Sequence, residues 1–292
     1  MVILSDVICL LIFPLAHAAP CFLPPLRPRA HLLSRSRVRS ALCGHSSTVA
    51  PLVTSSRRAA IAVAFGAAAE ALWVASNLKT IQQDNDVLKQ ELFSAIRPSS
   101  GVRDILEIGF GRNANQDFYT EIAERTGGLR VTGLDKRRVS LREADTMKRS
   151  AAEHGVTLDV MDGKAEALPF PDGSFDAVVC SFTLCSVDDP PQVFREASRV
   201  LRPGGKMIMI EHIAAREGTG LRAVQNAVTP IQAGLIGCHL TRSTDALVQS
   251  TVRPSADGEA PLFSSMDLCR VIDRNAFVFF PETPVLLSVV TK

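Results

Sequence analysis

The fold is decided by DILEIGFGRNAN, the stretch that runs from Asp104 to Asn115. Its first five residues are mainly apolar and predict a buried strand, and Gly109 and Gly111 follow at once. Residues 116–125 predict a helix. A strand, a glycine loop and a helix in this order let backbone N–H groups approach a ligand closely, because glycine has no Cβ atom in the way.

Two cofactors use such a loop. A dinucleotide places its pyrophosphate at the helix N-terminus in G-x-G-x-x-G/A loops, and Gly109, Gly111 and Ala114 fit that spacing. S-adenosylmethionine has no phosphate but carries an amino-acid end and a ribose. Glu107 favours S-adenosylmethionine, because a carboxylate two residues before the first glycine repels a pyrophosphate and attracts the cationic ammonium and sulfonium groups. A tight turn in an ordinary α/β core is the alternative without a ligand.

The N-terminal part of the chain differs in composition from the rest. The net charge of the 292 residues is +2, which gives no overall argument for a nucleic-acid partner. Residues 7–69, however, hold seven Arg and no Asp, Glu or Lys. An apolar run over 7–15, then Ala16-His17-Ala18 and a segment rich in Arg and Ser, predict a targeting leader over 1–58. It resembles the signal-plus-transit leader of plastid proteins in algae with secondary plastids; a mitochondrial leader and plain disorder are the alternatives.

A second apolar run covers 59–75, directly after Arg57-Arg58. Its length of roughly 25 Å as a helix is marginal for spanning a bilayer. One interpretation is a twin-arginine signal for the thylakoid lumen. The other, which we prefer because S-adenosylmethionine is made outside the lumen, is a retained helix on a membrane, in the plastid or, alternatively, at the endoplasmic reticulum. A buried Ala-rich helix is a third possibility.

The cysteines predict neither a disulfide framework nor a metal site. Three of the seven lie in the predicted leader, and Cys180, Cys185, Cys238 and Cys269 show no paired spacing. A reducing compartment such as the stroma follows from this pattern.

Residues 76–292 predict one domain in which strands alternate with helices. This order predicts a Rossmann-like, doubly wound α/β sheet of about seven strands with the last strand antiparallel. Residues 76–96 predict an amphipathic helix that serves either as a lid over the cofactor pocket or as a packing helix. Further strands are expected at 129–134, 157–161, 175–181, 206–211, 277–280 and 285–291, further helices at 139–154 and 187–201, and a flexible insertion at 251–262.

Ligands of such sheets bind at the carboxyl ends of the strands, where the strand order reverses. Asp135 ends the second strand and is expected to accept hydrogen bonds from the ribose hydroxyls of an adenosine cofactor. The segment from Lys164 to Glu166, Cys185 and His212 fall at other strand ends.

Four motifs make a resemblance definite: EIGFG from Glu107, the acid Asp135, ALPFPDGSFDAVV and RVLRPGG. In this order they resemble class I S-adenosylmethionine-dependent methyltransferases of the methyltransferase type 11 group, over about residues 104–212. Two departures are Asn113 in place of the third loop glycine and Lys164 in place of an acid that often contacts the adenine. The resemblance implies these cofactor-binding residues: Glu107, Gly109, Gly111, Asn113, Asn115, Asp135, Ala165, Glu166 and Ser181.

Three further stretches, TLCSVDDP, IEHI and GCHLTR, resemble the branch that includes membrane-anchored thiol S-methyltransferases and their bacterial relatives. This resemblance implies a small-molecule acceptor, possibly a thiol, and a substrate pocket containing Cys185, Cys238 and Arg242. A quinone or phenol C- or O-methyltransferase is the alternative. From other classes, a nicotinamide-dependent oxidoreductase and a catalytically inactive membrane-associated binding protein stay open. No nucleic-acid partner and no metal are expected.

Two histidines are the candidate catalytic residues. His212 follows the fifth strand, and His239 lies in GCHLTR. A neutral imidazole can orient an acceptor or take its proton near pH 7. The alternative for each is a purely structural hydrogen bond.

Overall fold

The computed structural model describes residues 83–96, 101–255, 257–272 and 283–292. The predicted leader over 1–58, the apolar run over 59–75 and the predicted strand over 277–280 lie outside these ranges. Among the described residues, no helix has both the length and the apolar composition needed to cross a bilayer.

Beyond a helix over 83–94, the described part alternates strands and helices. The elements in chain order are β1 (Asp104–Ile108), α3 (Gln116–Thr126), β2 (Leu129–Asp135), α4 (Leu141–Ala152), β3 (Val156–Asp162), β4 (Phe175–Ser181), α5 (Pro190–Val200), β5 (Leu201–His212), α6 (Gly220–Ile236), α7 (Thr244–Thr251), β6 (Ser265–Ile272) and β7 (Val285–Thr291).

The seven strands form one sheet in the order β3-β2-β1-β4-β5-β7-β6. The five strands β3, β2, β1, β4 and β5 are parallel to one another, whereas β7 is antiparallel to both of its neighbours, β5 and β6. The strand order reverses between β1 and β4, so the carboxyl ends of these two strands mark the expected ligand position. The Rossmann-like fold and the antiparallel last strand are confirmed.

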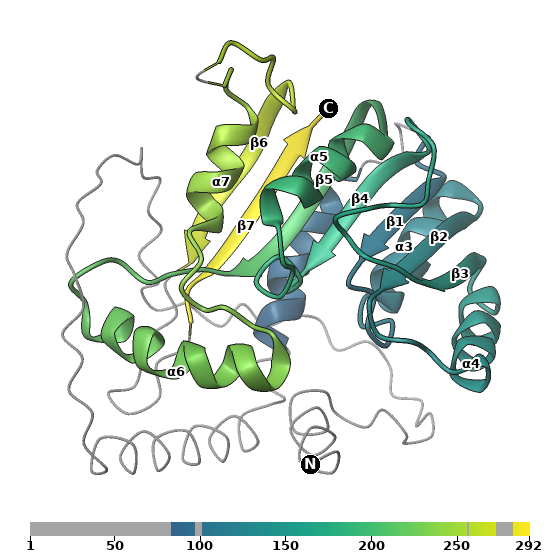
Figure 1. Ribbon diagram of the computed structural model, residues 1–292. Helices are drawn as coiled ribbons and strands as arrows, with labels where there is room; N and C mark the ends of the chain where they lie inside the picture. The colour runs from purple at the N-terminus through teal and green to yellow at the C-terminus, as the bar shows by residue number, and fades with distance from the viewer. Residues whose placement is uncertain (1–82, 97–100, 256, 273–282) are drawn as a thin grey trace, which may run out of the picture.

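Helices cover both faces of the sheet (Figure 1). One face is covered by the helix over 83–94, α3 and α4. Leu92 and Tyr119 belong to the hydrophobic core between these helices and the sheet. The α5 and α7 helices pack on the opposite face, with Phe194 and Val248 in a second core. Because parallel strands are covered on both sides, their side chains are buried almost throughout, as the apolar run in β4 illustrates.

Side-chain caps explain where three of the helices begin. Ser140 accepts a hydrogen bond from the backbone N–H of Glu143 at the start of α4. Asp189 does the same at α5, where two prolines occupy the first turn, and Thr219 does so at α6. Such caps satisfy N–H groups that have no partner inside the helix. The cap at Asp189 also explains why α5 begins later than residue 187, the expected start.

The strands β5 and β6 differ from the sequence prediction. The β5 strand begins at Leu201, before the expected start at residue 206, so the Arg-Pro-Gly-Gly segment belongs to the strand, with Gly204 at a φ of 76°. The edge strand β6 was not predicted at all. Its residues are only half-buried, and Asp267 and Arg270 interrupt its apolar pattern, because an edge strand is only partly covered.

The helix over 83–94 packs against the domain. Phe93 stacks on Phe118 with ring centroids 4.7 Å apart and contacts the ring edge of Tyr119 at 5.6 Å. Phe93 and Leu92 are part of the core, which supports the packing role that the sequence left open. The α6 helix instead lies across the edge at which β4 and β5 end (Figure 1), and its Gln225 side chain bonds the backbone of Ile213 and Ala215 there.

Candidate active site

The glycine loop after β1 has the backbone conformation that its sequence predicts. Gly109, Gly111 and Asn113 all have positive φ angles, of 75°, 57° and 61°. A Cβ atom on Gly109 would lie 2.0 Å from the Thr183 hydroxyl oxygen, so no larger residue fits there. Asn113 adopts the left-handed conformation in place of the family's glycine, as Asn does more readily than most residues. The turn therefore survives this departure.

Glu107, two residues before the loop, is fully buried. Its Oε1 accepts a hydrogen bond from Asn115 Nδ2 at 2.7 Å, and its Oε2 accepts one from the Tyr119 hydroxyl at 2.6 Å. Burial raises the pKa of Glu107 to about 7, although the Tyr119 hydrogen bond and the nearby Lys89 ammonium lower it. Lys89 comes from helix 83–94 and is itself buried, which lowers its pKa. A second cation beside this carboxyl group would favour its ionised form.

Two side-chain amide oxygens beside the loop are available to accept hydrogen bonds from a ligand. Asn115 is fully buried, and its Nδ2 bridges Glu107 and Ser181 at 2.7 and 3.2 Å. Within the described part of the chain, Asn115 Oδ1 and Asn113 Oδ1 are buried and accept no hydrogen bond. Leaving a buried acceptor unpaired costs roughly 1–3 kcal/mol, which a ligand N–H donor would recover. Carboxyl and amide oxygens beside a glycine loop fit the ammonium group of S-adenosylmethionine.

Asp135 lies at the end of β2, where the sequence predicts it. One carboxylate oxygen accepts a hydrogen bond from the Gly111 N–H at 2.8 Å, and the other accepts one from the Arg137 N–H at 2.7 Å. These bonds hold the carboxylate beside the glycine loop. Each carboxylate oxygen has a further lone pair for a hydroxyl donor, so this position fits a ribose.

Glu166 and Ala165 follow β3 at the same edge. Glu166 accepts hydrogen bonds from the backbone N–H groups of Asp188 and Asp189, at 2.8 and 3.4 Å. Burial alone would raise the pKa of Glu166, but these bonds hold it below its usual value. Glu166 therefore ties the segment after β3 to the start of α5. Lys164 forms a backbone bridge with Ala167, and its effect on cofactor binding stays a prediction.

A buried acid that the sequence analysis assigned no role organises the loop after β4. Glu211, near the end of β5, is fully buried and accepts hydrogen bonds from the backbone N–H groups of Thr183 and Leu184 at 2.7 and 2.9 Å, and of Cys185 at 3.4 Å. Burial raises its pKa well above the usual value. The detectable signal was an acid at the end of the apolar run KMIMI. The same loop contains Phe182 at a φ of 52°.

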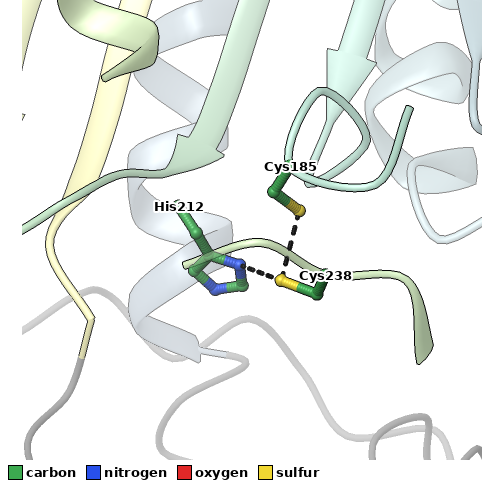
Figure 2. A group of neighbouring side chains, drawn as sticks. All are labelled: Cys185, His212 and Cys238. Atoms are coloured by element: carbon green, nitrogen blue, oxygen red, sulfur yellow. Dashed lines mark hydrogen bonds between the residues drawn. The ribbon is translucent and has the colours of Figure 1, made fainter. Parts of the chain in front are cut away.

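Three predicted side chains meet at the ends of β4 and β5. Cys185 follows β4, His212 ends β5, and Cys238 follows α6; their side chains point toward one another (Figure 2). The two sulfur atoms are 3.4 Å apart, and Cys238 Sγ is 3.9 Å from His212 Nδ1. Both cysteines are buried, whereas His212 is half-buried with its ring 4.6 Å from that of Phe182.

The two thiols of this cluster differ in acidity. The hydrogen bond with Cys238 and burial raise the pKa of Cys185 to about 12. The same hydrogen bond lowers the pKa of Cys238, which also lies near the Arg242 guanidinium. Cys238 is therefore the thiol that ionises first.

His239 and Arg242 both lie in the segment after α6, beside this cluster. The His239 backbone N–H donates to the Cys185 carbonyl at 2.8 Å, and His239 is not part of the three-residue cluster. The Arg242 guanidinium donates to the carbonyl groups of Leu184 and Val187. Arg242 therefore holds the loop after β4 in place, and its predicted contact with a substrate stays a prediction.

A surface hollow between α5 and α7 lies apart from these groups. It is lined by residues such as Arg195, Gln249 and Glu259, and none of the predicted site residues contributes to it. We place the candidate active site at the strand ends because the strand-order reversal, the glycine loop and the Cys–His–Cys cluster coincide there.

Comparison with known proteins relates this chain to methyltransferases. Residues 106–209 match the protein family described as methyltransferase domain. Thiol S-methyltransferase TMT1B from Homo sapiens is 36% identical over 162 residues, which cover 53% of this chain and 63% of that protein. Thiol S-methyltransferase TMT1A from Homo sapiens is 35% identical over 162 residues, with the same shares covered. Demethylmenaquinone methyltransferase from Thermus thermophilus is 34% identical over 135 residues, 45% of this chain and 59% of that protein.

Proposed function

Because residues 106–209 match the family described as methyltransferase domain, we propose that this protein transfers a methyl group from S-adenosylmethionine to a small molecule. The aligned region spans 63% of the length of the human thiol S-methyltransferases it resembles. The observation that carries the proposal is the set of groups beside the glycine loop, above all the unpaired Asn115 Oδ1 and the buried Glu107 carboxyl group. A nicotinamide dinucleotide would bring a pyrophosphate to this carboxyl group.

The residues of the chain have separate tasks in this proposal. Glu107 and Asn115 bind the amino-acid end of the cofactor, and Asp135 binds its ribose. When bound, S-adenosylmethionine supplies an electrophilic methyl group with a good leaving group. The protein then has mainly to hold the acceptor atom in line with that methyl group and to exclude water. In this proposal the acceptor binds at the ends of β4 and β5, across which α6 lies (Figure 1).

We propose a thiol as the acceptor class. A thiol has a pKa of about 8.5, so it loses its proton near neutral pH with little assistance from a general base. A phenol depends more strongly on such a base, and a ring carbon depends on it most. At the acceptor side, the described residues place two thiols and an imidazole, and no described carboxylate belongs to this cluster. The similarity to thiol S-methyltransferases supports the same choice.

A turnover screen tests this function. The full chain is incubated with S-adenosylmethionine and alkyl thiols, aryl thiols, phenols or prenylated quinones, and S-adenosylhomocysteine is measured. Turnover highest with thiols is the expected result. Turnover only with quinones would instead support the alternative that the demethylmenaquinone methyltransferase relative suggests.

Binding measurements separate the remaining classes. Calorimetry on the full chain should show micromolar binding of S-adenosylhomocysteine, the range in which many enzymes bind their substrates, and no binding of NAD(H). Binding of NAD(H) alone would support an oxidoreductase. Binding of neither ligand would support an inactive membrane-associated protein.

We further propose a plastid location, in the stroma or at the thylakoid membrane, with residues 1–58 as leader and residues 59–75 as a membrane-associated helix. The acid-free, Arg- and Ser-rich composition of the leader supports this proposal. A fluorescent protein fused to residues 1–69 should enter the plastid of an alga with secondary plastids. Diffuse cytosolic fluorescence would reject the targeting role, and mitochondrial fluorescence would favour that organelle.

A further inference from the structure

The cluster of Cys185, His212 and Cys238 has the composition of a metal site. Each residue offers one ligand atom, two sulfurs and Nδ1 of the imidazole, and these three atoms all lie within 4.8 Å of one another. The residues come from the loop after β4, the end of β5 and the segment after α6 (Figure 2). They therefore form no metal-binding motif that could be recognised from their spacing in the sequence. The two cysteines are 53 positions apart.

The distances within the cluster are close to those of a tetrahedral zinc site. With Zn–S of about 2.3 Å and Zn–N of about 2.0–2.1 Å, a tetrahedral ion separates two sulfurs by about 3.8 Å and a sulfur from a nitrogen by about 3.5 Å. The observed separations are 3.4 Å between the sulfurs and 3.9 Å from Cys238 Sγ to His212 Nδ1. Movements on the order of 1 Å would place all three atoms on one ion.

The backbone around the cluster is held in place independently of a metal. The Glu211 carboxyl group binds the N–H groups that lead to Cys185. The His239 N–H donates to the Cys185 carbonyl at 2.8 Å, which joins the segment after α6 to the loop after β4. Arg242 ties the same two segments together through Leu184, and its carbonyl accepts from Ala214 after β5 at 2.9 Å. The three ligand-bearing elements are thus fixed relative to one another.

The sulfur and nitrogen donor atoms of the cluster indicate which metal it would bind. Two thiolates and an imidazole are the donors that zinc prefers, whereas Ca²⁺ and Mg²⁺ take oxygen ligands. Two thiolate charges balance the charge of Zn²⁺, which makes the ion compatible with a buried position. We propose that Cys185, His212 and Cys238 bind one zinc ion.

The number of ligands gives this zinc ion an open position. Structural zinc sites have four protein ligands, whereas three protein ligands leave the fourth position to water or substrate. The described residues provide only these three candidate ligands at this place. The half-buried His212 lies on the more accessible side of the cluster.

The fourth position would take the sulfur of the acceptor thiol, a step that rests on the proposed function. A thiol bound to zinc loses its proton outright, and the proton passes to solvent. The resulting thiolate would be held at the ends of β4 and β5, next to the strand-order reversal. His212 then acts as a metal ligand through Nδ1, in place of the role that the sequence predicts, which is to orient the acceptor or to take its proton.

Metal content of the full chain tests the zinc site directly. The full chain, produced in zinc-supplemented medium and purified without chelators, should contain about one zinc ion per molecule, as measured by elemental mass spectrometry. The Cys185→Ser, Cys238→Ser and His212→Ala variants should each lose most of it. Cys269→Ser and His154→Ala, which change residues outside the cluster, are the matched controls and should keep it. Fewer than about one zinc ion per ten wild-type chains would overturn the proposal.

Cobalt provides a readout that does not depend on folding of the variants. Wild-type chain is stripped with pyridine-2,6-dicarboxylate, dialysed and reloaded with Co²⁺. Thiolate-to-cobalt charge-transfer absorption should appear and should disappear when Zn²⁺ is added. No charge-transfer absorption, or a Cys185–Cys238 disulfide found by thiol counting in the unfolded wild-type chain, would overturn the zinc site.

Addition of an acceptor distinguishes the two parts of the inference. Benzyl mercaptan added to the cobalt-loaded chain should raise the charge-transfer absorption by about half, as three thiolates replace two. Benzyl alcohol, the matched control, should not. Metal binding without this increase overturns the open acceptor position. Methylation of thiols by a zinc-free chain overturns the binding of the acceptor sulfur by zinc but leaves the proposed function standing, whereas a zinc-loaded chain that binds no S-adenosylhomocysteine overturns the proposed function.

Discussion

The two halves of the candidate active site are built in different ways. The cofactor half, comprising the ends of β1 and β2 and the glycine loop, is assembled from residues close together in the chain: Glu107 bonds Asn115 and Tyr119, which are 8 and 12 positions away. The acceptor half comprises the loop after β4, the end of β5 and the segment after α6. There Glu211 bonds Leu184 across 27 positions and Arg242 bonds Leu184 across 58.

This difference shows how proteins of one fold can bind the same cofactor and yet methylate different acceptors. The cofactor half depends mainly on the backbone conformation of the glycine loop and on hydrogen bonds within it, with Asp135 and Ser181 joining it from other strands. The acceptor half depends on which segments cross the ends of β4 and β5, so its side chains can change without disturbing the glycine loop. Two buried acids, Glu107 and Glu211, anchor the two halves and offer a direct way to compare them.

The largest effect is expected for Glu211→Ala in the acceptor half. It removes the acceptor of three backbone N–H groups, and each orphaned buried donor costs roughly 1–3 kcal/mol. The free energy of unfolding, measured by urea denaturation, should fall by about 3 kcal/mol or more. Glu153→Ala, at an exposed position after α4, should change it by less than about 0.5 kcal/mol. Equal losses in the two variants would mean that Glu211 does not anchor the loop.

Glu107 should make stability depend on pH in the cofactor half. Its pKa is about 7 in the folded chain and 4.5 as a free side chain. The folded state thus binds the proton more tightly, and the resulting stability is fully present below pH 4.5 and is lost as the pH rises through 7. The full loss is about 3 kcal/mol. Glu107→Gln keeps the shape and removes the titration, so its unfolding free energy should fall less over this range; parallel curves would contradict the raised pKa.

Asp135→Ala should weaken the cofactor half without affecting the acceptor half. Loss of charge-assisted hydrogen bonds to the ribose should cost roughly 1.5–3 kcal/mol, or about 10- to 150-fold in the dissociation constant of S-adenosylhomocysteine. Calorimetry with the full chain measures this change. Asp159→Ala, on the exposed side of β3, should bind like wild type. Unchanged affinity of Asp135→Ala would remove this residue from the site.

The smallest effect is expected for Asn113→Gly in the glycine loop. Glycine adopts the φ of 61° without strain but loses the 2.8 Å hydrogen bond from Asn113 Nδ2 to Gln116 Oε1. The two contributions oppose each other, so stability should change by less than about 0.5 kcal/mol. Asn113→Ala keeps the strain and loses the bond, and should cost about 1 kcal/mol or more. Thermal unfolding of both variants gives the comparison, and a large loss for the glycine variant would show that the Asn113 side chain is essential.

The amino-acid sequence by itself determined the cofactor half. The apolar strand, the two glycines and the helix after them specify a strand–loop–helix unit, because each residue's conformational preference acts on its immediate neighbours. The alternation of strands and helices likewise predicted the parallel sheet, since parallel strands are joined by crossover connections that usually contain a helix. Asp135 was predictable for the same reason, as the last residue of its strand.

Only the tertiary structure decided the acceptor half. Cys185 and Cys238 are adjacent because α6 lies across the ends of β4 and β5, and His212 joins them because β5 is the neighbour of β4. Neither the order of the strands nor the path of α6 can be derived from residue spacing, so the cysteines looked unrelated and Glu211 looked like the polar end of a strand. Burial, which gives Glu211 its raised pKa and its role as acceptor of three N–H groups, exists only once segments distant in the chain have packed around it.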